Sequence, residues 1–146
     1  MKYKVYTDGA YSQDKGVGGS SYLILTDTHY ISSDSSTLNR IDNPTNAETA
    51  AVGNAAAYLL KNVGVTSDDI VEFHIDCLAT VTFCRKQAHM KGMVYSNNQK
   101  VITAIQNVRK LAKVCPVVFT KVKGHKNVMT PNTVVDRLSK LAVRRD

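Results

Sequence analysis

The spacing of apolar residues changes near residue 43, and this change limits the folds that the chain can adopt. Over the first 37 residues, short runs of alternating or β-rich character are joined by sequences rich in Gly, Ser and Asp, which is typical of strands and turns. From Pro44 to Gly64, apolar residues recur at helical spacing. Further β-rich and helical runs then alternate. We therefore expect an α/β protein with a mixed sheet flanked by helices.

The predicted order is three strands, a helix, a strand, one or two helices, a strand and a last helix. The strands are expected at residues 3–8, 20–26, 29–33, 70–76 and 117–122, and the helices at 44–63, 78–90, 98–114 and 133–145. The short connections between the first three strands predict an antiparallel meander. The segment GAYSQDKGVGG is expected as the turn after the first strand, which would then end at Asp8.

Composition and charge narrow the class of partner. The chain has 146 residues, 43% of them hydrophobic, and a formal net charge of +7, which fits one globular domain over residues 1–146. Residues 1–84 hold five Lys/Arg and ten Asp/Glu, whereas residues 85–146 hold fourteen and two. A basic half can be no more than a solvated surface. Combined with the acids of the other half, it favours a polyanionic partner.

The cysteines and the N-terminal segment indicate the compartment. Three cysteines without CxxC spacing predict neither a disulfide framework nor a zinc site. The segment MKYKVYTDG lacks the apolar stretch of a secretory signal. No apolar run approaches the ~20 residues of a membrane span. We therefore expect a cytoplasmic protein with no membrane partner.

Four carboxylates stand in four separate segments, each where a turn or a helix could aim it at one point. They are Asp8, Glu48, Asp76 and Asp136. If the strands ending at Asp8 and Asp76 are parallel neighbours, both carboxylates emerge at the carboxyl edge of the sheet, where open α/β sheets bind ligands. Carboxylates hold hard divalent cations, and lysines and arginines hold phosphates. An acidic cluster in a basic chain therefore indicates a metal-dependent nuclease.

Three of these acids also have a structural interpretation. Asp8 precedes glycine and could be a turn residue. Asp76 could cap the helix that follows it. Asp136 lies near the start of a helix, where a carboxylate favours the helix dipole whatever its function. Each acid taken alone is therefore weak evidence for a metal site.

Glu48 has a more specific alternative, because it lies three residues after Thr45 and could complete a capping box. If Asn43 caps the helix instead, as Pro44 at the first helical position favours, Glu48 falls in the second turn and is free to point elsewhere. We favour Asn43 as the cap.

His125 lies in KVKGHKN, just past the last expected strand. An exposed loop histidine most often has no special role. One flanked by lysines near a metal site could transfer a proton, because imidazole titrates near neutral pH.

Taken together, the motifs resemble ribonuclease H type 1. In order along the chain they are TDGAYS, NAET, HID, VKGH and NTVVD, and they cover essentially the whole chain. Each motif is common, but five in order with compatible spacing are specific. The resemblance implies the ribonuclease H-like fold, with a mixed five-stranded sheet that is antiparallel over the first three strands and then parallel. The basic, tryptophan-rich protrusion of some members is not expected, because the chain has no Trp.

The resemblance also implies a function. The family cleaves the RNA strand of RNA/DNA hybrids with two Mg²⁺ ions, or with Mn²⁺, leaving 5′-phosphate and 3′-hydroxyl ends. It implies Asp8, Glu48, Asp76 and Asp136 as metal ligands and catalytic residues, with His125 assisting catalysis. The alternatives are a non-catalytic binding module of this fold or a DNA nuclease on it. We expect the chain to act as a monomer.

Substrate contacts follow from the same resemblance. The implied substrate-binding residues are Gly9, Ala10, Tyr11, Thr45, Asn46, Cys77 and Asn132. The first three match a turn that lies against the RNA strand, and Cys77 stands where the family usually has serine. Lys86 and Lys91, with the Lys100–Lys113 face, are expected at the DNA strand.

Overall fold

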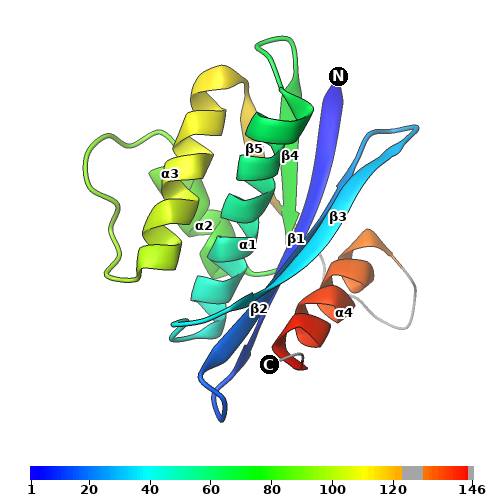
Figure 1. Cartoon of the computed structure of the whole chain (residues 1–146). Helices are drawn as coiled ribbons and strands as arrows, with labels where there is room; N and C mark the ends of the chain where they lie inside the picture. Colours follow the sequence, from blue (N-terminus) through cyan, green and yellow to red (C-terminus); the bar gives the residue numbers. More distant parts are fainter. Residues whose placement is uncertain (123–129, 145–146) are drawn as a thin grey trace.

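The computed structural model describes residues 1–122 and 130–144, and these residues form a five-stranded sheet covered by helices (Figure 1). The strands are β1 (Lys2–Ser12), β2 (Val17–Leu25), β3 (Tyr30–Leu38), β4 (Ile70–Ile75) and β5 (Val117–Lys121), in the order β3-β2-β1-β4-β5. The β1–β2 and β2–β3 pairs are antiparallel, and the β1–β4 and β4–β5 pairs are parallel. The predicted fold class is confirmed.

The helices cover both faces of the sheet. They are α1 (Pro44–Tyr58), which continues as a π-helical turn at Leu59–Val63, α2 (Leu78–Gln87), α3 (Gln99–Val114) and α4 (Pro131–Arg144). Helices α1 and α4 lie on opposite sides of β1 and β2, and α3 packs against α1 (Figure 1). The second helix ends three residues before its predicted end. Among the helices described, none is long and apolar enough to cross a membrane.

The first strand is longer than predicted. β1 continues past Asp8 to Ser12, and Gly9, Ala10 and Tyr11 pair with β2 instead of forming a turn. The turn is confined to the next four residues, where Gly16 adopts a φ of 64°. The prediction of a turn at residues 9–11 was therefore wrong, because glycines that serve close packing within the strands resemble turn glycines in the sequence.

The start of α1 settles the role of the capping residues. Asn43 is the N-cap, and its side-chain oxygen accepts a hydrogen bond of 2.9 Å from the amide of Asn46. Pro44 occupies the first turn, where its missing N–H costs nothing. The cap at Asn43 is confirmed, so Glu48 lies in the second turn and is not needed to cap the helix.

Alternation along β1 and β4 separates the core from the opposite face of the sheet. Val5, Phe73 and Ile75 face the core and have no exposed surface. The ring of Phe73 stacks on Phe119 of β5, with centroids 5.3 Å apart. Burying such a side chain stabilises the fold by about 1.5–3 kcal/mol. The even-numbered residues of both strands therefore point away from α1 and α3.

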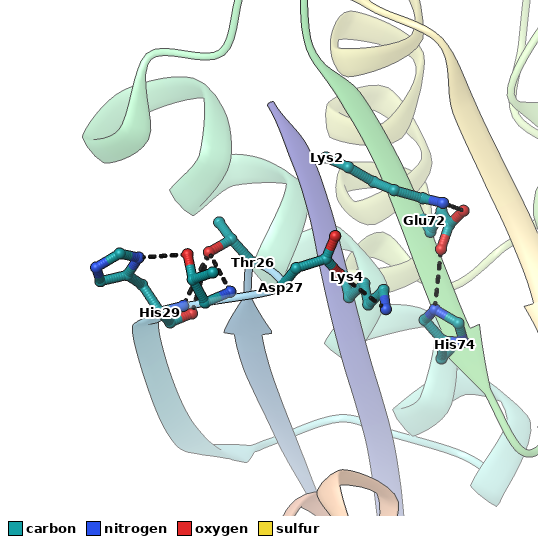
Figure 2. A network of polar contacts seen from close by, with 8 residues as sticks. Lys2, Lys4, Thr26, Asp27, His29, Glu72 and His74 are labelled. Carbon is teal, nitrogen blue, oxygen red and sulfur yellow. Dashed lines mark hydrogen bonds and ion pairs between the residues drawn. The ribbon is translucent and has the colours of Figure 1, made fainter.

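Polar side chains occupy that opposite face near the start of the strands. The Lys2 ammonium lies 2.9 Å from one oxygen of Glu72, and Nε2 of His74 lies 3.4 Å from the other (Figure 2). The His74 ring stacks on Tyr6, with centroids 4.7 Å apart. These pairs form rows across two parallel strands. The next even-numbered residues after Tyr6 and His74 in the chain are Asp8 and Asp76.

Candidate metal centre

The parallel pairing of β1 with β4 ends at the pair Thr7 and Ile75. Asp8 and Asp76 are the residues that follow this pair, so the predicted meeting of two acids at the carboxyl edge of the sheet is observed. β4 stops here whereas β1 continues, which leaves the β4 side of β1 open at Asp8. This opening allows side chains from both helical layers to approach Asp8.

Glu48 reaches the cluster because β1 passes unusually close to α1. A Cβ atom on Gly9 would lie 2.4 Å from both the carbonyl carbon of Ala47 and the amide nitrogen of Glu48. Only a residue without a side chain allows this approach. As a result, one carboxylate oxygen each from Asp8, Glu48 and Asp76 lies within 4.8 Å of the others.

Asp136 approaches from α4, on the other side of the sheet. Its side chain hydrogen-bonds with Asp8 and contributes to raising the pKa of that group. It also forms an ion pair of 3.1 Å with Lys140, one turn further along the helix. Asp8, Glu48 and Asp76 therefore form one cluster, and Asp136 joins it through Asp8.

The cluster disfavours the ionised forms of Asp8 and Glu48. Burial is the main cause of the raised pKa of Asp8, and the charges of Asp76 and Asp136 add to it. Burial likewise raises the pKa of Glu48 strongly, and the negative charge of Asp8 reinforces the shift. Asp8 and Glu48 at this spacing are stabilised when a proton or a cation neutralises their charge. A divalent cation would relieve the repulsion that protons otherwise neutralise.

The donor set fits a hard divalent cation. Asp8 and Glu48 are only 4% and 7% exposed, so water does not compensate their charges. Within the described part of the chain, the Oε2 atom of Glu48 is buried and has no hydrogen-bond partner. A buried carboxylate oxygen left in this state is costly unless a ligand from outside the chain completes it. Oxygen donors at short range are the set that Mg²⁺ and Mn²⁺ prefer.

The structure spreads the predicted substrate-binding residues around this cluster. Thr45 and Asn46 lie half-buried in the first turn of α1. Cys77 is the N-cap of α2 and gives no capping hydrogen bond, so Asp76 does not occupy the N-cap position. Asn132 is buried in α4, and both polar atoms of its amide are without a hydrogen-bond partner among the described residues.

The remaining predicted residues lie further out. Lys86 is exposed in the last turn of α2, and Lys91 is exposed in the connection to α3. Ala10 and Tyr11 continue β1 away from the cluster, and Tyr11 packs against a small apolar group at the end of β3. His125 lies outside the described residues.

A polar hollow of about 970 Å³ lies between the end of β3, α1 and the start of α3. Arg40 and Lys100 line it, and none of the four acids does. Asn98 joins its walls, because its amide nitrogen donates to the Arg40 carbonyl at 2.9 Å and lies 3.2 Å from a carboxylate oxygen of Asp42. The sequence did not reveal this hollow. Its one signal, an asparagine before a helix, predicts only a cap.

Comparisons with known proteins agree with this geometry. The RNase H family model matches residues 1–144. The structure resembles the N-terminal RNase H domain of Rv2228c from Mycobacterium tuberculosis, solved as a fusion with maltose-binding protein, with a TM-score of 0.75 and 16% identity, over 99% of this chain and 95% of that one. It also resembles RNase H1 from the halophilic archaeon Halobacterium salinarum, with a TM-score of 0.72 and 16% identity, over 100% of both chains.

A third similar structure is LC11-RNase H1 in complex with an RNA/DNA hybrid, with a TM-score of 0.71 and 16% identity, over 98% of this chain and 97% of that one. A search of curated protein sequences finds no match. At these identities the structural likeness concerns the fold.

Proposed function

This chain belongs to the RNase H family, and we propose that it is an endoribonuclease that cleaves the RNA strand of RNA/DNA hybrids. The observation that carries the proposal is the convergence of Asp8, Glu48 and Asp76 within 4.8 Å, with Asp136 beside Asp8. The hybrid bound to the similar LC11-RNase H1 supports the substrate class. We propose that residues 1–146 act as a single catalytic domain.

The four carboxylates would hold two Mg²⁺ ions, for which Mn²⁺ can substitute. When bound, the ions would polarise the phosphate and make water a better nucleophile at neutral pH. The chain itself orients the carboxylates from four elements, which are β1, the end of β4, α1 and α4. Products would carry 5′-phosphate and 3′-hydroxyl ends, and His125 would assist proton transfer.

We propose that residues beside the cluster, together with Ala10 and Tyr11 further along β1, contact the RNA strand. These residues are Gly9, Ala10, Tyr11, Thr45, Asn46, Cys77 and Asn132. Hydrogen bonds to 2′-hydroxyl groups would distinguish RNA from DNA without reading its sequence. The amide of Asn132, which has no hydrogen-bond partner in the described part of the chain, suits this task because an amide can both donate to and accept from a hydroxyl.

The basic residues on the α2–α3 side would contact the DNA strand. The double variant Lys86→Gln/Lys91→Gln should reduce the dependence of log K on log salt concentration by roughly one unit per lysine. Fluorescence anisotropy with a labelled hybrid, measured across salt concentrations, tests this. Lys61→Gln, an exposed lysine in the π-helical turn beyond α1, is the control and should leave the slope unchanged. An unchanged slope in the double variant would remove both lysines from the interface.

A cleavage assay tests the function directly. The chain is incubated with an RNA/DNA hybrid in Mg²⁺ or in EDTA, beside matched single-stranded RNA, duplex RNA and duplex DNA. We expect metal-dependent cutting of the RNA strand of the hybrid alone. A hybrid that is bound but left intact would support the non-catalytic module, and cutting of DNA would support a DNA nuclease.

A further inference from the structure

The position of Asp136 depends on how α4 is attached to the sheet, because this acid alone comes from that helix. Among the described residues, two hydrogen bonds and one close backbone approach link α4 to β2 and β3. The Ser21 hydroxyl donates to the Val135 carbonyl. The Thr37 hydroxyl donates to the Ala142 carbonyl at 2.6 Å. Between them, Gly19 lies so close to α4 that a Cβ atom there would be 2.1 Å from the Ser139 carbonyl oxygen.

The contacts of Ser21 and Gly19 advance along β2 and along α4 together, and that of Thr37 lies on the neighbouring strand β3. Residues 135, 139 and 142 form one stripe along a helix, since they are four and three positions apart. Gly19 and Ser21 lie two positions apart on one face of β2, and Thr37 is the β3 partner of Gly19. Two residues of strand span about 6.6 Å and four residues of helix about 6 Å, so the step from Ser21 to Gly19 matches the step from Val135 to Ser139. These contacts therefore fix the position of α4 along β2.

Ser21 is the contact next to the acid cluster. It pairs directly with Asp8 across the β1–β2 ladder, so both side chains point to the α4 face. Its acceptor, Val135, immediately precedes Asp136 in the chain. Ser21 and Val135 are 1% and 0% exposed, so water does not compete for this hydrogen bond. The strand residue opposite Asp8 thus holds the helix residue that precedes Asp136.

We infer that Ser21 is a positioning residue that sets Asp136 at its distance from Asp8 and so completes the metal centre. The inference rests on the proposed metal-dependent function. Without the Ser21 hydroxyl, the Val135 carbonyl loses its link to β2, and α4 is free to shift at the end that carries Asp136. Thr37 serves the far end of α4, seven residues beyond Val135, and has no such effect on the cluster.

The test measures Mn²⁺ affinity by isothermal titration calorimetry, in the absence of nucleic acid. Ser21→Ala should weaken Mn²⁺ binding on the order of tenfold, as expected when a group that orients a metal ligand is lost. Thr37→Val is the matched control, because it removes the other hydroxyl that bonds to an α4 carbonyl without changing side-chain size. It should lower the melting temperature by a similar amount and leave Mn²⁺ affinity unchanged. If Ser21→Ala does not fold, Ser21→Cys keeps the volume with a weaker donor and is used in its place.

A double-mutant cycle separates positioning from general loss of structure. In the Asp136→Asn background, the further change Ser21→Ala should have no additional effect on Mn²⁺ affinity. An equal loss in both backgrounds, or an equal loss in Thr37→Val, would overturn the inference, as would a wild-type chain that binds no Mn²⁺. A chain that binds Mn²⁺ with these dependences yet leaves the hybrid uncut would overturn the proposed function and not the role of Ser21.

Discussion

Replacing Asp8 with asparagine should abolish cleavage of the hybrid while leaving hybrid binding intact. Asp8 is the acid that interacts with all three others, since Glu48, Asp76 and Asp136 all act on its ionisation. The amide has the shape of the carboxylate but carries no charge to hold a cation. Several kcal/mol of transition-state stabilisation should be lost, which corresponds to a rate decrease of about a thousandfold or more. Binding should persist, because removing a negative charge favours a polyanion.

Single-turnover cleavage in Mg²⁺ and hybrid binding in EDTA, followed by anisotropy, measure the two quantities separately. Asp14→Asn is the matched control, because it makes the same chemical change at an exposed position in the β1–β2 turn. It should alter neither quantity. Mg²⁺-dependent turnover retained in Asp8→Asn would contradict the assignment of Asp8 as a metal ligand. Loss of both cleavage and binding would indicate a folding defect, which circular dichroism would show.

Local signals predicted the parts of the fold that depend on neighbouring residues. The Asn43-Pro44 pair predicted the start of α1. It also correctly predicted that Asn43 caps the helix, so that Glu48 does not form a capping box with Thr45. The ends of the predicted first and fourth strands placed Asp8 and Asp76 at one edge of the sheet. The convergence of these two acids required only that the strands be parallel neighbours.

Contacts between elements distant in the sequence could not be predicted in this way. Gly9 looked like a turn residue, but it lies within β1. Glycine is required there because α1 passes within contact distance of its backbone. Gly19 was assigned to the same turn, whereas it makes room for α4. Ser21 is one of several serines in β2 and β3, and only the pairing with Asp8 and the approach of Val135 distinguish it.

Replacing Glu48 with glutamine should stabilise the metal-free chain at alkaline pH and remove its stabilisation by Mg²⁺. The folded-state pKa of Glu48 lies above its unfolded value, chiefly through burial and then through the charge of Asp8. A raised carboxyl pKa contributes stability that is complete below the unfolded pKa of about 4.5 and is lost as the pH rises through the folded value. In EDTA, wild-type stability should therefore fall from pH 5 to pH 8. Glutamine does not ionise and can donate a hydrogen bond to Asp8. The free energy of unfolding of the variant should therefore fall less and exceed that of the wild type by about 1–2 kcal/mol at pH 8.

Urea unfolding at pH 5 and pH 8, in EDTA and in saturating Mg²⁺, measures these differences. For the wild type, Mg²⁺ at about a hundred times its dissociation constant should add about 2.7 kcal/mol, and Glu48→Gln should lose most of this gain.

Glu72→Gln makes the same change on the opposite face of the sheet, where Lys2 lowers the pKa of the carboxyl group (Figure 2). A lowered carboxyl pKa contributes stability at high pH and loses it as the pH falls, so this control should be slightly destabilised at pH 8 and keep its response to Mg²⁺. The opposite signs matter, because a general effect of replacing glutamate would move both variants in the same direction. A Glu48→Gln variant that is less stable than wild type in EDTA at pH 8 would contradict the view that the charge of Glu48 destabilises the metal-free fold.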